Sequence, residues 1–280
     1  MNASESQTEV SLVASPFDLR VSLGEHVSEQ EMQTALETGQ CGFVHSFTTG
    51  SVVDGPGVRI VAWLTGCQFR CLYCHNPDTW KLKNGIPITL PRALEAIQKY
   101  RHGLRVMKGG LTISGGEPLL QHRFVLNVFR AVRKMGIHTA LDTNGAFGTR
   151  LTDQDLQEVD LVLLDLKAFS PDLHQRLTGM DNQPVLEFAQ RLATLRRPAW
   201  IRFVLVPGLT DDLAEIDRLA DFIVKLPNVE RVEVLPFHQL GRFKWEKLGM
   251  NYELRNVEPP SPAKTDEAVE RFRVRGLKTF

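Results

Sequence analysis

Three cysteines lie close together in one short stretch of the chain, where Cys67, Cys71 and Cys74 are separated by four and three residues. Thiolates are soft ligands, and iron–sulfur clusters are held by cysteines that are near one another in sequence. A cluster of four irons normally takes four thiolates, whereas this stretch supplies three. The spacing therefore indicates an iron–sulfur cluster in which one iron is left open to a ligand that is not protein.

Two other chemistries are compatible with three neighbouring cysteines. Zinc accepts three cysteines and a histidine, so the cysteines together with His75 could form a structural zinc site. Zinc fingers and ribbons usually bring two pairs of ligands from separated places, and the sequence has no second pair. A disulfide would leave one of the three cysteines unpaired, and the sequence shows no secretory signal pattern. The cluster is favoured, and zinc stays open as the alternative.

Length, hydrophobic content and net charge limit the classes of protein to which the chain can belong. The chain has 280 residues, 42% of them hydrophobic, and its 33 basic and 33 acidic residues give a formal net charge of zero. This length allows a substantial core and can be filled by one α/β barrel, while the balanced charge gives no indication of a nucleic-acid partner. No stretch reaches the roughly 20 apolar residues of a membrane span. We therefore expect a soluble, cytoplasmic protein without membrane contact.

Residues 1–41 differ in composition from the rest of the chain. They are rich in Ser, Thr, Gln and Glu and have few periodic apolar positions. We expect a mostly disordered extension, with disorder over the first ~25 residues. One short helix is expected within it, begun by a capping box at Ser28 and Glu31 and ended at Gly39. Residues 42–280 would then form a single domain.

Apolar, β-branched runs alternate with helical patterns along this domain, after a first short strand pattern at residues 43–47. The alternation predicts a parallel sheet covered by helices. Six strands are two short of a closed eight-stranded barrel, so a partial (β/α)6 barrel is expected, with a flat doubly wound sheet as the alternative. No phosphate-binding glycine motif follows the first parallel strand, which weakens that alternative. The six strands would start at Val58, Leu111, His138, Leu161, Trp200 and Val229.

Polar residues follow most of these predicted strands. Ligands of parallel α/β proteins bind at the carboxyl ends of the strands. Each polar group also has a plain structural explanation: Asp142 and Asn144 could be turn formers, Asp165 and Lys167 an ion pair, and His238 a surface histidine. Their common position nevertheless indicates one site. It would comprise the cysteine loop, residues 115–117, 142–144 and 165–167, Arg202 and His238.

With these residues assembled, the chain resembles the radical S-adenosylmethionine (SAM) superfamily, and within it the glycyl-radical-enzyme activase family. The resemblance spans about residues 42–280 and does not cover residues 1–41. It implies a partial barrel of the radical SAM type that binds a 4Fe–4S cluster and SAM. The segments that carry it are residues 54–59, 66–76, 114–117, 141–145, 163–167 and 235–241.

The resemblance also implies roles for individual residues. It makes Cys67, Cys71 and Cys74 the ligands of the cluster. A monovalent cation near the SAM carboxylate would be held by Asp142, Thr143 and Asp165, and Arg202 is a weaker candidate for contact with cofactor or peptide. No acid or base catalyst is implied, because the cluster and SAM carry the chemistry. The residues implied to contact SAM are Tyr73, Cys74, His75, Gly116, Asp165, Leu166, Lys167 and His238.

The implied reaction is reductive cleavage of SAM to methionine and a 5′-deoxyadenosyl radical, which removes a hydrogen atom from a glycine α-carbon in a partner enzyme. The implied partner is pyruvate formate-lyase, with the electron supplied by a one-electron donor such as flavodoxin or ferredoxin. Another glycyl-radical enzyme is the alternative partner. Many activases of those enzymes have an inserted module with extra cysteines, and residues 76–111 contain none. A zinc-stabilised binding module without catalysis is the alternative from a different class.

Overall fold

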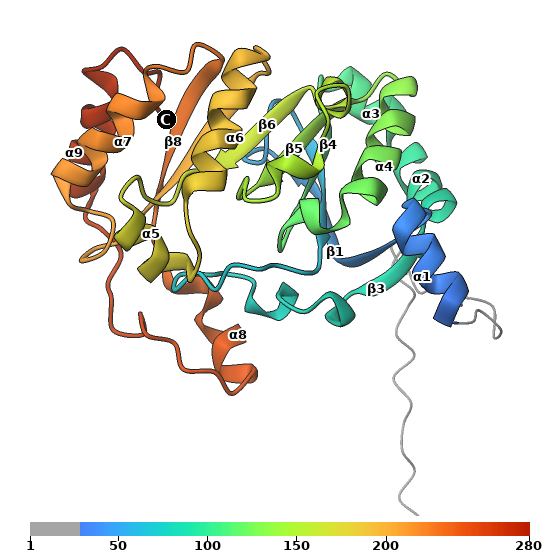
Figure 1. Ribbon diagram of the computed structural model, residues 1–280, viewed down its shortest axis with the longest axis horizontal. Coiled ribbons are helices and arrows are strands. Elements are labelled where there is room, and N and C mark those ends of the chain that lie inside the picture. Colours follow the sequence, from blue (N-terminus) through green and yellow to red (C-terminus); the bar gives the residue numbers. More distant parts are fainter. Residues whose placement is uncertain (1–28) are drawn as a thin grey trace, which may run out of the picture.

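The computed structural model describes residues 29–280 (Figure 1). The predicted disorder of the first 25 or so residues, and Ser28 of the capping box, lie outside this range. The predicted short helix is present as α1 (Glu29–Thr38), and Gly39 follows it with a positive φ of 71°. The first strand, β1, begins at Cys41, one residue before the predicted domain boundary. That boundary itself stays a prediction.

The core of the protein is one sheet of eight strands in the order β3-β1-β2-β4-β5-β6-β7-β8. Strand β2 and strands β4 to β8 run parallel, which confirms the six predicted parallel strands. Strands β1 and β3 add an antiparallel extension beside β2. The strands are β1 (Cys41–Ser51), β2 (Arg59–Leu64), β3 (Ile86–Thr89), β4 (Gly110–Gly115), β5 (His138–Thr143), β6 (Leu161–Asp165), β7 (Ala199–Leu205) and β8 (Val229–Pro236).

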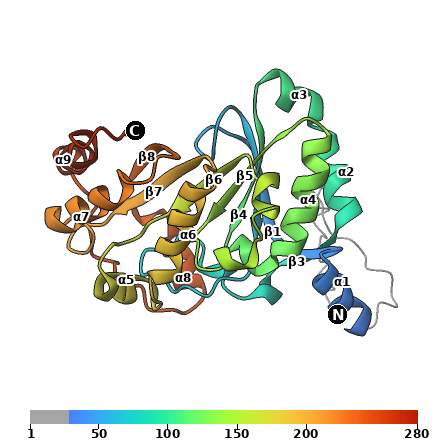
Figure 2. The same ribbon diagram turned by 45° about the horizontal axis from the view of Figure 1, so that its top comes forward.

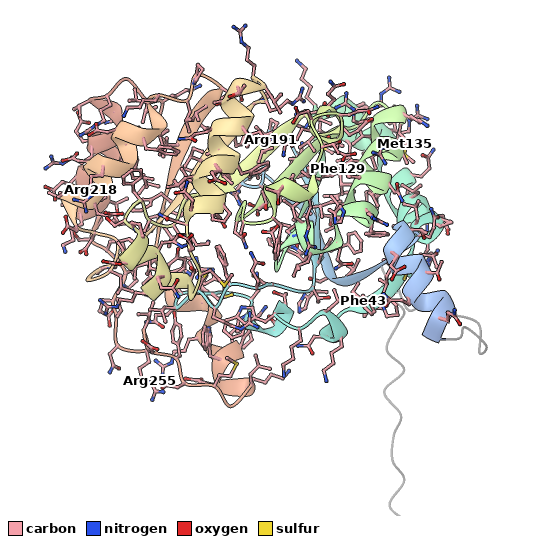
Figure 3. All side chains as sticks on the ribbon, in the orientation of Figure 1. Phe43, Phe129, Met135, Arg191, Arg218 and Arg255 are labelled. Atoms are coloured by element: carbon pink, nitrogen blue, oxygen red, sulfur yellow. The ribbon has the colours of Figure 1, made fainter. Side chains whose placement is uncertain are left out.

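Helices connect the parallel strands, and α4, α6 and α7 lie along one side of the sheet (Figures 1 and 2). Phe129 of α4 is fully buried on that side, whereas Arg218 and Arg255 lie at the periphery (Figure 3). Within residues 29–280, no helix is long and apolar enough to span a membrane. The helices after α1 are α2 (Leu90–Gln98), α3 (Arg101–Val106), α4 (His122–Lys134), α5 (Pro171–Thr178), α6 (Gln183–Thr194), α7 (Leu213–Ile223), α8 (Arg242–Lys247) and α9 (Pro262–Arg273).

The sheet is not closed, because β3 and β8 are its two edges and do not pair with each other. Its parallel strands follow one another in chain order, without the reversal of a doubly wound sheet, so the predicted partial barrel is confirmed. The β8 edge is covered by the end of the chain, where Val232 donates its N–H to the carbonyl of Lys278 (2.8 Å) and accepts from Phe280 N–H (3.1 Å). The guanidinium of Arg231 lies 3.4 Å from the ring centre of Trp200 and 4.8 Å from that of Phe280. This cover protects a strand edge that would otherwise be open to pairing with another chain.

The carboxyl end of helix α1 is attached to helix α4. The side chain of Arg123 donates to the carbonyl of Glu37, and Asn127 Nδ2 donates to the carbonyls of Thr38 and Gly39, both at 3.1 Å. These bonds use carbonyls that the last turn of a helix leaves without partners. The segment before the domain is therefore anchored to it from α1 onward.

The two faces of the sheet differ in what they bury. A small apolar cluster of Ala140, Leu161, Leu163 and Trp200 is separate from the main core. Because side chains on a strand alternate between faces, residues two positions further along share the face of this cluster. Those residues are charged: Asp142 follows Ala140, Asp165 follows Leu163, and Arg202 follows Trp200. The sequence thus builds an apolar layer with a charged layer beside it, nearer the carboxyl ends of the strands.

Candidate functional site

A cavity of about 440 Å³ lies at the carboxyl ends of the parallel strands. It is lined by the loop after β2, the turns after β4 and β5, the residues after β6, and the end of β8. The site predicted from strand ends is therefore brought together in one place. The predicted residues that line it include Cys67, Cys71, Tyr73, Cys74, His75, Gly115, Gly116, Asp142, Asn144, Lys167 and His238. Asp165, Leu166, Thr143 and Arg202 do not line it.

The backbone of the cysteine loop is hydrogen-bonded to Trp80, shortly after the loop, and to the distant helices α5 and α8. None of these bonds requires a particular side chain on the cysteine loop, since each uses its backbone. The bonds run from Cys67 N to Trp80 O (3.1 Å), from Arg70 N to Thr178 O (2.8 Å), from Leu72 N to Leu177 O (3.0 Å), and from Trp245 Nε1 to Cys74 O (2.8 Å). The loop therefore has a fixed backbone although it has no regular secondary structure.

The turn after β4 touches the cysteine loop so closely that any side chain at position 116 would force one of the two to shift. A Cβ atom at Gly116 would lie 2.3 Å from the carbonyl oxygen of Gly66 and 3.2 Å from Cys67 Cβ. The next residue, Glu117, donates its N–H to the same Gly66 carbonyl at 2.7 Å. The bare backbone of this turn thus forms one wall of the cavity beside the first cysteine.

Glu117 is a buried carboxylate that joins the turn after β4 to the turn after β5. It is fully shielded from solvent and accepts hydrogen bonds from Leu119 N (2.9 Å), Thr143 Oγ1 (2.7 Å) and Asn144 N (2.8 Å). Burial raises the pKa of its carboxyl to about 7, against the opposing effect of these donors. Glu117 belongs to the predicted site as part of this turn, but its sequence position indicates no function of its own.

Replacing Glu117 by glutamine is expected to change the pH dependence of stability between pH 6 and pH 8, by removing a contribution that falls as the pH rises. The native state keeps a proton on Glu117 up to about pH 7, whereas the unfolded chain loses it near the ordinary value of 4.5. The native state therefore binds more protons in this window, and stability must fall as the pH rises, by about 1 kcal/mol from this group between pH 6 and pH 8. Urea unfolding of the metal-free protein measures it. An equal pH dependence in Glu117→Gln and wild type would contradict the assignment.

Lys167 enters the cavity from the end of β6 and is held there by an ion pair. Its Nζ lies 3.0 Å from Asp165 Oδ2 and 5.5 Å from the ring centre of Tyr73. Although burial lowers it, the pKa of Lys167 is held well above its ordinary value by the charge of Asp165. The structural explanation of an Asp165–Lys167 ion pair is thus correct, and Asp165 acts on the cavity through Lys167. Leu166, between them, is buried and donates its N–H to the carbonyl of Arg202 at 3.0 Å.

Arg202 lies behind the cavity in a group of carboxylates. Its guanidinium contacts Asp142 Oδ2 (3.2 Å), Glu233 Oε2 (3.1 Å) and Asp54 Oδ1 (3.4 Å). Asp142 also accepts from Ser114 Oγ at 2.6 Å, and burial raises its pKa while Arg202 opposes the rise. Asp142 therefore lines the cavity, and Arg202, which does not line it, holds the Asp142 carboxylate in place.

The predicted cation ligands are each bonded to a different partner. Asp142 contacts Arg202, Thr143 donates to Glu117, and Asp165 pairs with Lys167. The cation site stays a prediction.

His75 and His238 face each other at the edge of the cavity. Their ring centres are 4.1 Å apart, and His75 Nε2 donates to the carbonyl of His238 at 3.3 Å. Across residues 29–280, no three His, Cys, Asp or Glu side chains converge in the way that ligands of a single metal ion do. In a four-iron cluster each thiolate binds a different iron, so the thiolates need not meet at one point.

The residues present are suited to a 4Fe–4S cluster with SAM beside it. Three thiols line one cavity, whereas the fourth cysteine, Cys41, is buried elsewhere and lines a separate pocket beside α1. Burial raises the pKa of all three thiols in the metal-free chain, and a bound cation favours the thiolate form instead. The hydroxyl of Tyr73 is buried without a partner among the described residues. It is thus a polar group free to bond a ligand.

Asn144, one of the predicted residues, lies beside the first cysteine, whereas Trp80 and Trp245 were not predicted. Asn144 Nδ2 lies 4.0 Å from Cys67 Sγ, and its Oδ1 accepts from Gln68 Nε2 at 3.1 Å. The rings of Trp80 and Trp245 meet edge to face, with centres 5.2 Å apart, behind the loop. Asn144 was predicted because it directly follows a strand. The two tryptophans have no such local signal, because their contact joins segments far apart in the chain.

Comparison with known proteins gives concordant similarities. Residues 61–223 match the protein family described as Radical SAM superfamily. The chain is 45% identical to the pyruvate formate-lyase 1-activating enzyme of Escherichia coli K12 over 235 residues, which cover 83% of this chain and 94% of that protein. It is 44% identical to the pyruvate formate-lyase-activating enzyme of Staphylococcus aureus USA300 over 236 residues, covering 82% and 92% of the two chains.

Solved structures show the same fold. A domain of pyruvate-formate lyase-activating enzyme from Bacteroides vulgatus superposes with a TM-score of 0.52 at 27% identity, over 61% of this chain and 98% of that chain. A radical SAM methyltransferase from Sphaerobacter thermophilus superposes with a TM-score of 0.58 over 91% of this chain and 81% of its own. At 15% identity, the second similarity concerns the fold alone.

Proposed function

Because this chain belongs to the radical SAM superfamily, and within it to the pyruvate formate-lyase-activating enzymes, we propose that it activates pyruvate formate-lyase by generating a glycyl radical in it. The observation that carries the proposal is the identity of 45%, which extends over 83% of this chain and 94% of the relative. Membership of an enzyme family rules out the alternative of a zinc-stabilised binding module without catalysis.

Two cofactors follow from the family, a 4Fe–4S cluster and SAM. The chemistry that they supply when bound is reductive cleavage of SAM, which yields a 5′-deoxyadenosyl radical able to take a hydrogen atom from a glycine α-carbon. The chain's own residues bind, orient and enclose these groups, because the cofactors carry the difficult chemistry.

Cys67, Cys71 and Cys74 are the proposed ligands of the cluster. The proposal is supported by their common position on one wall of the cavity and by the distance of Cys41 from it, in a separate pocket. Three thiolates leave one iron without a protein ligand, which is the coordination that SAM requires if its amino and carboxylate groups are to bind iron.

The residues proposed for the SAM site are of two kinds: some contact SAM directly, and others hold those contacting residues in position. Backbone at Gly116 can approach an amino group closely because no side chain intervenes. Lys167 brings a buried positive charge, and Tyr73 a buried hydroxyl with no described partner. His75 and His238 close the edge of the cavity. Asp165 and Leu166 are proposed as positioning residues, since they hold Lys167 and the end of β6.

The apolar part of the cavity has a separate task. Much of the remaining lining is aromatic or aliphatic, and such a lining excludes water and polar groups that could divert a reactive intermediate. A carbon-centred radical reacts with accessible C–H bonds, so the cavity must admit the substrate glycine and little else. The residues in question are Trp63, Phe69, Trp80, Val204, Leu235 and Phe237.

The electron for SAM cleavage is proposed to come from a one-electron donor protein such as flavodoxin or ferredoxin. The partner that receives the radical is proposed to present its glycine on a loop, since the glycine must enter a cavity of about 440 Å³. A folded domain could not fit in this volume.

Anaerobic incubation with pyruvate formate-lyase, SAM and dithionite is expected to produce a glycine-centred radical, detected by electron paramagnetic resonance. The matched control is pyruvate formate-lyase in which the radical-bearing glycine is replaced by alanine, and it should give no signal. If SAM is cleaved but the radical appears only in a different glycyl-radical enzyme, the chain is an activase of that enzyme instead.

A further inference from the structure

The cysteine loop, the residues that follow it and helix α8 are together strongly basic, although the whole chain has a formal net charge of zero. Residues 66–84 and α8 together contain six basic residues and two acidic ones, Asp78 and Glu246. Both acidic groups are paired, Asp78 with Lys244 at 3.0 Å and Glu246 with Arg242 at 2.7 Å. The basic residues are Arg70, Lys81, Lys83, Arg242, Lys244 and Lys247. A net positive charge is therefore concentrated here.

Most of these basic residues are exposed. The side chains of Arg70, Lys81, Lys83 and Lys247 are exposed, and none of them forms an ion pair within residues 29–280. Figure 1 shows the segment after the cysteine loop and α8 along the same lower edge of the molecule. We call this surface the basic face and define it by Arg70, Lys81, Lys83, Arg242 and Lys247.

The basic face is attached directly to the back of the cysteine loop. Arg70 Nη1 donates to the carbonyls of Cys67 and Phe69, both at 2.7 Å, and its guanidinium lies 4.8 Å from the ring centre of Trp80. Trp80 in turn packs against Trp245 of α8, which donates to the carbonyl of Cys74. A protein bound to this face would therefore be separated from the proposed cluster only by the loop itself and two indole rings.

The proposed function involves two partner proteins, one that presents the glycine and one that donates the electron, and they require different distances from the cofactors. Transfer of a hydrogen atom requires the glycine to touch the radical inside the cavity, whereas an electron can cross a thin layer of protein. The basic face lies outside the cavity and none of its residues lines it. This position suits the partner that delivers an electron rather than the partner that delivers a glycine.

The surface has the composition of an interface. Phe243 and Leu248 are 61% and 43% exposed on and beside α8, next to the cations Arg242 and Lys247. Apolar groups surrounded by charged ones are typical of protein interfaces, and charge complementarity speeds association and selects the partner. An acidic protein would be attracted to this face from a distance.

We propose that the basic face is the docking site of an acidic one-electron carrier protein, with Phe243 as its apolar contact. This inference rests on the proposed function, which requires one electron for each SAM cleaved. The carrier loses one electron and the cluster of this protein gains it, so no further reactant is needed.

The test compares two triple charge reversals. The control set lies at exposed positions near the carboxyl ends of α3, α4 and α7, which lead into the amino ends of their strands, opposite the cavity. A purified flavodoxin is the probe, and dithionite replaces it in parallel reactions. The test variant is Lys81→Glu/Lys83→Glu/Lys247→Glu, and the control is Arg105→Glu/Lys134→Glu/Lys225→Glu.

At low ionic strength we expect the test variant to lose about tenfold in affinity for flavodoxin and in the rate of cluster reduction by reduced flavodoxin. Its reduction should also lose the salt dependence of the wild type. With dithionite, cluster reduction and glycyl-radical yield should equal those of the wild type, and the control variant should behave as wild type throughout. Phe243→Ala should weaken flavodoxin binding at both low and high salt.

Three results would overturn the proposal. They are equal flavodoxin affinity in the test and control variants, an equal loss of reduction with dithionite, and a higher KM for pyruvate formate-lyase in the test variant under dithionite. The last result would assign the face to the radical-accepting partner. Failure of the proposed function is distinguishable, because it would appear in the wild type as the absence of a glycyl radical with dithionite.

Discussion

Replacing any one of Cys67, Cys71 or Cys74 by alanine is expected to reduce cleavage of SAM to background. Each thiolate is proposed to bind a different iron, and the loop that carries them has a fixed backbone, so no neighbouring group can take the place of a missing ligand. The measurement is release of 5′-deoxyadenosine from anaerobically reconstituted protein with dithionite, together with iron and sulfide content. Retained cleavage in any of the three variants would contradict the ligand assignment.

Cys41→Ala is the matched control, since it removes the fourth thiol of the chain. Cys41 is 3% exposed and lines a different pocket, so its loss should cost about 1 kcal/mol of stability as a small buried group. Iron content and cleavage should equal those of the wild type. Loss of iron from this variant would show that the count of ligands is wrong.

Gly116→Ala is expected to lower kcat/KM for SAM cleavage by about 100-fold, the order of loss that a displacement of about 1 Å can produce. The added methyl group would lie 2.3 Å from the carbonyl oxygen of Gly66. That atom is backbone next to the first cysteine, so relief of the contact must move either the cysteine loop or the turn that is proposed to receive the SAM amino group. Steady-state release of 5′-deoxyadenosine at varied SAM concentration measures the effect.

Gly103→Ala serves as the control for this substitution. It lies in α3, where the nearest atom to an added Cβ is Met107 Cε at 3.6 Å, an ordinary contact. Alanine favours a helix more than glycine does, so activity should be unchanged and the melting temperature unchanged or higher. Wild-type kinetics in Gly116→Ala, with this control also normal, would show that the close approach of the two loops is not needed.

The parallel part of the sheet could be predicted from the sequence because its strands are buried on both faces. Residues 161–164, for example, form an unbroken apolar run, and each is at most 2% exposed. Strand β3 could not be predicted in this way. It has four residues, contains Pro87 and is partly exposed, so neither its length nor its pattern distinguishes it from a loop. Its existence depends on pairing with β1, which is a tertiary contact.

The candidate site was predictable where chemistry is encoded locally, as in the cysteine spacing and the glycine turn after β4. It was not predictable where a residue acts through distant partners. Glu117 accepts from Thr143 and Asn144, 26 and 27 residues further along the chain, and Trp245 donates to Cys74 across 171 residues. Nor could the sequence say that Asp165 would lie behind the cavity and Lys167 within it, because alternation places both on one face.

Mössbauer spectroscopy of the anaerobic protein containing ⁵⁷Fe, with and without SAM, tests directly whether the chain holds a four-iron cluster with one iron open to SAM. We predict a four-iron cluster in which one iron changes its isomer shift when SAM is added while the other three do not. Four irons unaffected by SAM, or protein that binds no iron under any oxygen-free preparation, would contradict this prediction.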